Sequence, residues 1–360
     1  MADKVLTSFF YVCLKKRGYM KKNMKIKLAV SIFILLTGGA VFAKAKTNKK
    51  ALTSIRIGNA GGVNAEIGGP VGVAKKLGLF EEEFAKIGIN KVEYAGFDGG
   101  PVVNEAFVAG ELDFAAIGDV PGLTGLVNKV GSVWIGEGDS SSPVVVAVKK
   151  GSSIKKAEDL KGKTVAVAFG TAYHNQYYKY FIENKISFDD FETVNLLPSN
   201  ATPALLSGSI DAQVVGFIYV YQLYQKGEID IIFNTAKDKP EWSQQNWFIG
   251  NRKLLKEHPE AGVAFFKALL RARKAVVETE GHYYELLTPA LKAYPEYAAQ
   301  VYNYDGNFSG FNLEITDKNI AQTKSLYDFL KQQERVNGPW NEKTFVDTSY
   351  YFQALKELNQ

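Results

Sequence analysis

Three residues whose side chains could do chemistry lie close together within residues 166–181, AVAFGTAYHNQYYKYF. Thr171 and His174 are about one helical turn apart, a spacing that would let an imidazole act as the base for a threonine nucleophile. Such a site also needs a carboxylate to orient the imidazole, and none lies nearby in the sequence. An acid from elsewhere in the fold could supply it, so an enzyme that uses His174 is one hypothesis. The other is that Thr171, His174 and Asn175 hold a ligand without reacting.

The elements around this stretch favour the second hypothesis. A strand-like run ends at Gly170 and a helical pattern follows, and the same order of strand, turn and helix recurs at 97–101, 118–121 and 199–203. In an open parallel sheet these turns gather at the carboxyl edge, where ligands bind. Each helix N-terminus there offers unpaired N–H donors and partial positive charge. Their repetition predicts an anion site that needs no arginine, although each single turn could be an ordinary helix cap.

The candidate ligand-binding residues are those that these turns would bring to one cleft. The polar and backbone contacts are expected from Gly99, Asp119, Gly170, Thr171, His174 and Asn175. Tyr173, Phe217 and Tyr219 are expected to form an aromatic wall for the apolar part of the ligand. The Gly-rich segment 58–72 could be a cleft loop that contributes Asn64, or a plain linker.

Other kinds of chemistry find little support. The three histidines are scattered, and the only cysteine, Cys13, lies in the N-terminal leader, so no metal-ligand spacing appears. KGKT at 161–164 follows a helix and precedes a strand, the reverse of a phosphate-binding loop. We therefore expect neither a metal nor a cofactor.

The charge distribution separates a basic leader from a nearly neutral body. Of the 43 Lys/Arg and 38 Asp/Glu, nine basic residues and one acid fall in residues 1–45, which leaves 34 basic and 37 acidic residues. A body of this charge gives no electrostatic reason to expect nucleic acid. Within the leader, MKKNMKIK precedes the apolar run LAVSIFILLTGGAVF, the pattern of a signal peptide cleaved after Ala43 or Ala45. A retained membrane anchor is the alternative, and residues 1–19 could be an over-extended start.

The body alternates strand and helix patterns, which predicts an α/β fold with mostly parallel sheets. One unit is expected at 50–142 and a second at 143–243. The strand pattern at 244–251 returns the chain to the first unit, which 244–360 completes with C-terminal helices. Two crossings between units form a double hinge, an arrangement suited to two lobes that close on a ligand.

Several motifs, in this order and spacing, resemble one family. They are Gly100-Pro101, Glu105-Ala106, Gly110 and Asp113, then Gly118-Asp119-Val120-Pro121, then IKKAEDLKGKTVAV at 154–167, then Gly170 with His174-Asn175. From about residue 54 to 270 the chain resembles the periplasmic solute-binding proteins for aliphatic sulfonates, taurine and nitrate, which supply ABC importers. The resemblance implies a type II binding-protein fold, a periplasmic location and a permease partner in the inner membrane. It also implies that Asp119, Thr171, His174 and Asn175 lie at or near the ligand.

One departure from that family bears on the ligand. Many relatives carry Trp-Asp-Pro-Tyr where this chain has Gly216-Phe217-Ile218-Tyr219, so Phe217 replaces an acid that could pair with a ligand ammonium. We therefore expect a monomeric, non-enzymatic binding protein for a small organic anion, an aliphatic or aromatic sulfonate rather than taurine. Nitrate, bicarbonate or a pyrimidine-type vitamin precursor, a cleft enzyme that uses His174, and the input domain of a sensor remain alternatives.

Overall fold

The computed structural model describes residues 52–61, 67–288 and 294–359. The expected leader, its cleavage sites at Ala43 and Ala45, and Asn64 lie outside these residues. The described residues belong to one unit of the chain, Leu52–Gln360. Among them, no helix combines the length and the apolar character that crossing a lipid bilayer requires.

The first sheet has five strands in the order β2-β1-β3-β10-β4. Its strands are β1 (Ser54–Asn59), β2 (Lys91–Gly96), β3 (Phe114–Gly118), β4 (Ser132–Ser142) and β10 (Gln244–Asn251). β1 pairs in parallel with β2 and β3, whereas β10 is antiparallel to both β3 and β4. Trp247, Phe248 and Ile249 of β10 are fully buried, so a strand from far along the sequence lies inside this sheet, between β3 and β4.

The second sheet repeats the design in the order β7-β6-β8-β5-β9. Its strands are β5 (Val144–Lys149), β6 (Thr164–Val167), β7 (Glu192–Asn195), β8 (Ala212–Gly216) and β9 (Ile229–Asn234). Here β5 is the antiparallel strand, and β6 runs parallel to β7 and β8. Two five-stranded, mostly parallel sheets confirm the predicted α/β fold class.

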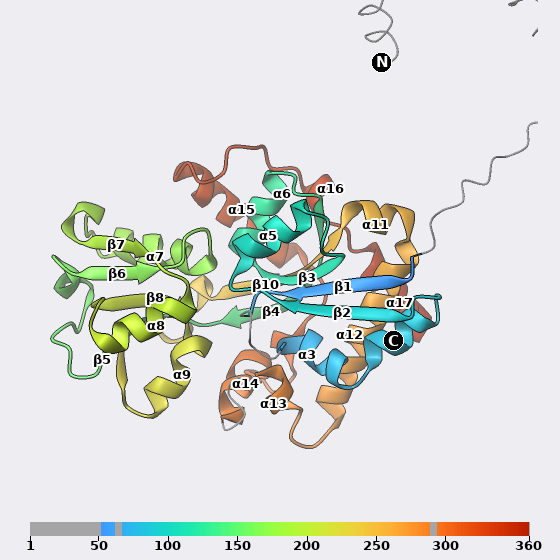
Figure 1. Ribbon diagram of the computed structural model, residues 1–360, viewed down its shortest axis with the longest axis horizontal. Helices are drawn as coiled ribbons and strands as arrows, with labels where there is room; N and C mark the ends of the chain where they lie inside the picture. The colour runs from blue at the N-terminus through green and yellow to red at the C-terminus, as the bar shows by residue number, and fades with distance from the viewer. Residues whose placement is uncertain (1–51, 62–66, 289–293, 360) are drawn as a thin grey trace, which may run out of the picture. The chain divides into compact units, whose positions relative to one another are not determined.

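Two segments connect the sheets, and they lie side by side. β4 leads through Pro143 into β5, and the chain returns from β9 through α10 (Thr235–Asp238) into β10. The Val144 N–H donates to Thr235 Oγ1 at 2.9 Å, and Ser142 pairs with Gln244. Both crossings therefore form one two-stranded connection, visible between the two sheets in Figure 1.

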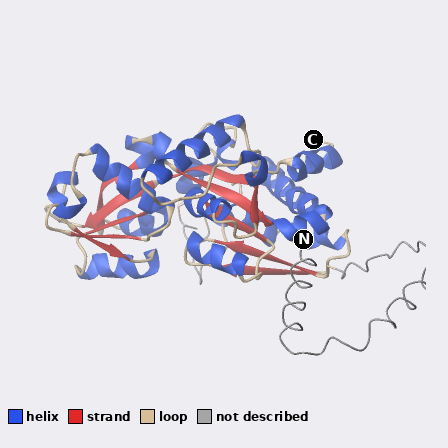
Figure 2. Ribbon diagram, turned by 90° about the horizontal axis from the view of Figure 1, so that it is seen from above, coloured by secondary structure: helices blue, strands red, loops and turns tan. Residues whose placement is uncertain are grey.

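Helices cover both faces of each sheet (Figures 1 and 2). Those between strands of the first sheet are α3 (Gly69–Lys76), α4 (Leu79–Ala85), α5 (Gly100–Val108) and α6 (Asp119–Val127). Those between strands of the second sheet are α7 (Ala172–Glu183), α8 (Pro198–Ser207) and α9 (Phe217–Gln225). The residues after β10 form α11 (Arg252–Glu257), α12 (Pro259–Glu278), α13 (Tyr284–Leu287), α14 (Pro295–Tyr302), α15 (Asp317–Gln332), α16 (Glu342–Phe345) and α17 (Ser349–Leu358).

The longest helix, α12, explains how the C-terminal segment joins the core. Its apolar residues recur at helical spacing, and ten of them are buried, Phe265 and Leu269 completely. Phe265 stacks on Phe114 of β3 and on Phe80 of α4, with ring centroids 4.4 and 5.3 Å apart. The C-terminal helices thus pack on the first sheet.

Candidate functional site

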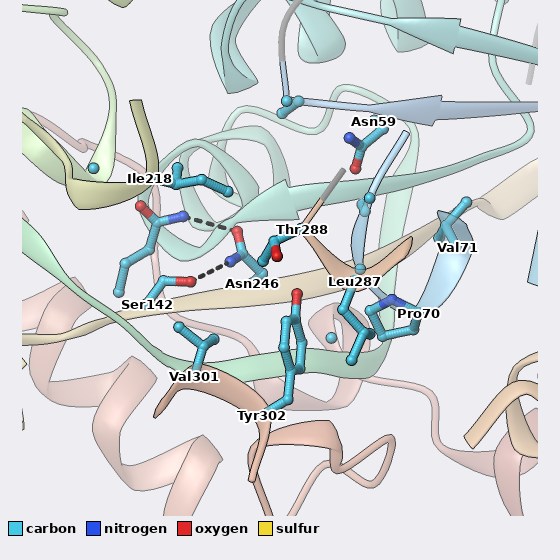
Figure 3. Close-up of a pocket in the computed structure, with 18 of the residues that line it drawn as sticks. Asn59, Pro70, Val71, Ser142, Ile218, Asn246, Leu287, Thr288, Val301 and Tyr302 are labelled. Carbon is cyan, nitrogen blue, oxygen red and sulfur yellow. Dashed lines mark hydrogen bonds between the residues drawn. The ribbon is translucent and has the colours of Figure 1, made fainter. Parts of the chain in front are cut away.

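A cavity of about 170 Å³ lies where the two sheets meet. It is smaller than the roughly 300–1,000 Å³ typical of pockets for drug-sized ligands, so it suits a small molecule. Residues from the end of β1, from both crossings, and from α3, α9 and the C-terminal helices line it (Figure 3); among them are Asn59, Pro70, Val71, Ser142, Ile218, Asn246, Leu287, Thr288, Val301 and Tyr302.

The two crossings supply a polar patch on the cavity wall. Gln244 Nε2 donates to Asn246 Oδ1 at 2.8 Å, and Asn246 Nδ2 donates to Ser142 Oγ at 3.3 Å (Figure 3). These bonds fix the orientation of the Asn246 amide, because its oxygen accepts from one neighbour and its nitrogen donates to the other. The patch is therefore ordered and uncharged.

Three helix N-termini also reach the cavity. Its lining includes Gly68 and Gly216, which precede the first turns of α3 and α9, and Tyr173 in the first turn of α7. Aligned peptide dipoles give each N-terminus a partial positive charge. None of the described lining residues is charged. The cavity can thus attract an anion through backbone dipoles alone.

A second, smaller cavity of about 30 Å³ adjoins the first. The two share Ala60, Tyr173, Tyr219, Gln244 and Asn246. The smaller one is also lined by residues at the N-termini of α5, α6 and α8: Gly99, Gly100, Gly118, Pro121, Leu197 and Pro198. Helix N-termini from both sheets therefore converge here.

A contact between α8 and the turn after β2 joins the two sides of the smaller cavity. Ser199 Oγ of α8 donates to Asp98 Oδ2, beside Gly99, at 2.5 Å. Asp98 is the only acidic residue among the described residues that line either cavity.

Four of the predicted site residues line these cavities. Tyr173 and Tyr219 line both, and their rings meet edge to face with centroids 6.2 Å apart. Burial raises the pKa of the Tyr219 hydroxyl, so it stays protonated and can donate. Gly99 and Thr171 line the smaller cavity. Gly99 has φ of 113°, a backbone conformation that favours glycine.

The Thr171–His174 pair is not arranged as a nucleophile and its base. Thr171 caps α7: its Oγ1 accepts from the His174 backbone N–H at 3.3 Å and donates to the Ala168 carbonyl at 2.6 Å. His174 Nδ1 accepts from the Gly170 N–H at 3.3 Å, and the threonine hydroxyl gives its hydrogen to the Ala168 carbonyl rather than to the imidazole. Gly170 itself has φ of 75°, in the left-handed region.

The imidazole of His174 is held neutral. It is 9% exposed and stacks on the Phe169 ring at 4.5 Å between centroids. Burial, with a smaller contribution from the Arg335 charge, lowers the pKa of His174 to about 3. At neutral pH the ring therefore carries no charge.

Five predicted residues line neither cavity: Asp119, Gly170, His174, Asn175 and Phe217. The Asp119 carboxylate accepts from the backbone N–H groups of Val120 and Gln245, at 2.7 and 3.3 Å. Phe217 packs against Tyr221 and Tyr297, with ring centroids 5.2 and 6.0 Å away. A direct role in ligand binding stays a prediction for all five.

Sequence reasoning missed two groups of lining residues. Gln244 and Asn246 begin the returning strand β10, and two polar residues at a strand start beside a chain crossing were a usable signal. The second group comes from α13, from the residue that follows it and from α14: Leu287, Thr288, Tyr297, Val301 and Tyr302. Nothing in their helical pattern indicates which of the C-terminal helices reaches the cavity.

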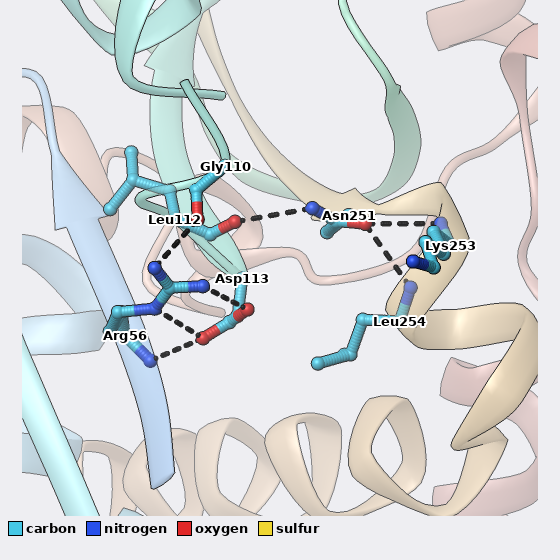
Figure 4. A network of polar contacts seen from close by, with 7 residues as sticks. All are labelled: Arg56, Gly110, Leu112, Asp113, Asn251, Lys253 and Leu254. Carbon is cyan, nitrogen blue, oxygen red and sulfur yellow. Dashed lines mark hydrogen bonds and ion pairs between the residues drawn. The ribbon is translucent and has the colours of Figure 1, made fainter. Parts of the chain in front are cut away.

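Asp113, part of the motif that begins at Gly100-Pro101, has a structural role (Figure 4). Its carboxylate accepts from Arg56 Nε at 3.0 Å and from Nη2 at 2.9 Å, and Arg56 Nη1 donates to the Gly110 carbonyl at 2.7 Å. This paired contact fixes the turn between α5 and β3 against β1. It holds the first sheet together at the end away from Asn59 and Ala60.

The described residues hold no cluster of three His, Cys, Asp or Glu side chains that could bind a metal ion. The described residues that line the two cavities offer hydroxyls, amides, aromatic rings and one carboxylate, Asp98.

Comparison with known proteins finds relatives that are named as sulfonate-binding proteins. A Bacillus subtilis (strain 168) protein named as a candidate aliphatic sulfonates-binding protein is 29% identical over 343 residues, 94% of this chain and 98% of that protein. A solved structure of a candidate periplasmic sulfonate-binding protein of an ABC transporter, SsuA from Methylobacillus flagellatus, matches with a TM-score of 0.66 and 25% identity. The match covers 86% of this chain and 95% of that one.

An enzyme shares the fold. The desulfurization enzyme DszB, solved in complex with biphenyl-2-sulfinic acid, matches with a TM-score of 0.66 at 12% identity, covering 85% of this chain and 100% of that one. At this identity the likeness concerns the fold alone.

The resemblance inferred from the motifs is thereby confirmed. The family model described as NMT1/THI5 like matches residues 69–280, which include both cavities' helix N-termini from α3 to α9. Because this match covers more than half of its residues, the chain belongs to the NMT1/THI5-like family.

Proposed function

We propose that this protein is an exported solute-binding protein that delivers a small organic anion, an aliphatic or aromatic sulfonate, to an ABC importer. The observation that carries the proposal is the convergence of helix N-termini on two small adjoining cavities. Among the described residues that line the larger cavity, none is charged. Such a site favours a compact anionic head group with an apolar tail. The similarity to the sulfonate-binding relatives supports the same ligand class.

The mechanism we propose is closure of two lobes, 50–142 with 244–360, and 143–243. The anionic head would meet the N–H donors of α7 and α9 from one lobe, and the turns around Gly99 and Asp119 of the other lobe would close over the other end of the ligand. Only the closed state makes both sets of contacts, so ligand binding shifts the population toward it. An inner-membrane permease would then recognise the closed, monomeric protein. Removal of the leader near Ala43 or Ala45 would release it into the periplasm, and N-terminal sequencing of the exported chain tests that step.

Native mass spectrometry tests the ligand class directly. The protein, purified without refolding, should retain a small anion whose mass corresponds to a sulfonate. Nitrate, bicarbonate or a pyrimidine in its place would contradict the proposal. Recovery of an added arenesulfonate unchanged after incubation would separate binding from a desulfurizing enzyme.

Discrimination against taurine is a further expected result. Taurine differs from ethanesulfonate by one ammonium group, which would have to enter a chamber with no acidic described lining residue. An unpaired buried ammonium is costly. Calorimetry should give an affinity for ethanesulfonate at least about tenfold above that for taurine. Tighter binding of taurine would refute this reading of the cavity.

The contact between Ser199 and Asp98 should contribute to closure. Ser199→Ala removes the hydroxyl that bridges α8 to the turn after β2, and we expect an affinity for ethanesulfonate about three- to tenfold weaker. Ser207→Ala is the matched control, because Ser207 lies on the same helix and its hydroxyl bonds locally, to the Ala204 carbonyl and to Ser209. Equal affinities in the two variants would mean that the bridge has no role in closure.

A further inference from the structure

The larger cavity has one wall that does not come from the strand-to-helix turns. Leu287 at the end of α13, and Val301 and Tyr302 at the end of α14, face it from the side opposite Ile218 and Asn246 (Figure 3). All three are buried. We call Leu287, Val301 and Tyr302 the C-terminal wall. It lies beyond residues 69–280, the part of the chain that matches the family model.

The C-terminal wall is held rigidly from behind. Gly310 packs so closely on α14 that a Cβ there would lie 2.1 Å from the Val301 carbonyl oxygen. Asn303 Oδ1 accepts from the Phe308 N–H at 3.1 Å, and Asn303 Nδ2 donates to Tyr284 Oη at 3.2 Å, which ties the end of α14 to α13. The wall therefore has a defined shape before any ligand arrives.

The wall also meets the N-terminus of α3. Tyr302 Oη lies 3.2 Å from where a Cβ on Gly69, the first residue of α3, would be. Pro70 and Val71 of the same helix end line the cavity beside Leu287 (Figure 3). A ligand whose head binds at the N-termini of α7 and α9 would thus direct its tail toward Leu287 and Val301.

We propose that the C-terminal wall determines the length of the apolar tail that the ligand can have, so that the segment outside the family match sets substrate specificity. This inference rests on the proposed function. The turns common to the family would select the anionic head, and α13 and α14 would select alkanesulfonates by chain length. Each methylene that fits against the wall should increase affinity roughly fourfold, until the tail meets Val301.

The test is calorimetry with the unbranched series from methanesulfonate to hexanesulfonate. Wild-type protein should show affinity rising by about fourfold per methylene to one best length and then falling. Val301→Ala should move the best length to a longer chain, and Val301→Phe should move it to a shorter one. Val336→Ala is the control, because Val336 is equally buried but lines neither cavity.

One further variant keeps the test decisive. Val301→Thr preserves the shape of the side chain and should fold like wild type, but it should reduce the affinity gain per methylene. If wild type binds the series and its chain-length profile is unchanged in all Val301 variants, the inference is wrong and the proposed function stands. If wild type binds none of the series, the proposed function itself is wrong.

Discussion

Gly216→Val should weaken binding of ethanesulfonate by about a hundredfold while the protein remains folded. Gly216 ends β8 at the base of the cavity, and the ring of Tyr173 lies directly against it. A Cβ at Gly216 would be 3.0 Å from Tyr173 Oη and 3.1 Å from Cε1. Because the interior behind Gly216 is close-packed, the added methyl groups would push the ring into the cavity that the ligand needs.

Two companion variants identify the cause. Gly216→Ala should have an intermediate effect, since a ring displacement of a few tenths of an ångström accommodates one methyl group. In a Tyr173→Ala background, Gly216→Val should have little further effect, because the ring that it displaces is absent. Calorimetry gives the affinities and circular dichroism confirms folding. Wild-type affinity in folded Gly216→Val would show that Tyr173 does not bound the ligand.

Acidification should destabilise the protein through His174. Burial lowers the pKa of the folded protein's imidazole to about 3, whereas in the unfolded chain it is about 6.5. Between these values the unfolded state binds more protons, so the free energy of unfolding falls as pH falls below about 6.5. The limiting slope is about 1.4 kcal/mol per pH unit, so the loss between pH 7 and pH 5 should be about 2 kcal/mol.

Urea unfolding of wild type and His174→Gln at both pH values checks this. The titratable and charged groups that face the imidazole are Tyr177 and Tyr178 from α7 and Arg335 after α15, and burial raises the pKa of Tyr177 to about 12. The variant lacks a titrating imidazole, so it should lose about 2 kcal/mol less than wild type between pH 7 and pH 5. An equal loss in both proteins would show that His174 is not held neutral by the fold.

The sequence was sufficient for the fold because the relevant signals are local. Strand-like runs followed by Gly or Pro and a helical pattern predict parallel strands, and the run at 244–251 was correctly placed as the strand that returns to the first sheet. The same turns led to Tyr173, Tyr219, Gly99 and Thr171, which do line the cavities. In each case the residue was predicted to lie near a ligand because it follows the end of a strand.

The rotation of each helix about its axis is what the sequence could not supply. Successive residues of a helix point about 100° apart, so in the first turn of α7 Ala172 and Tyr173 line the cavities while His174 and Asn175 do not. In α9 the same geometry directs Tyr219 to the cavities and Phe217 to Tyr297. That rotation depends on packing between elements far apart in the chain. The same packing determines that α14, rather than another C-terminal helix, lines the larger cavity.

The position of β10 has a consequence for how the chain reaches its native state. β10 lies between β3 and β4, yet about a hundred residues that build the second sheet separate it from β4 in sequence. The first sheet cannot be completed until residue 251 is available and a long loop has closed, a step that slows folding. The second sheet uses only strands from 144–234 and can assemble earlier. The first sheet, whose two lobe-connecting strands β4 and β10 must meet, would therefore be the last part of the described chain to form.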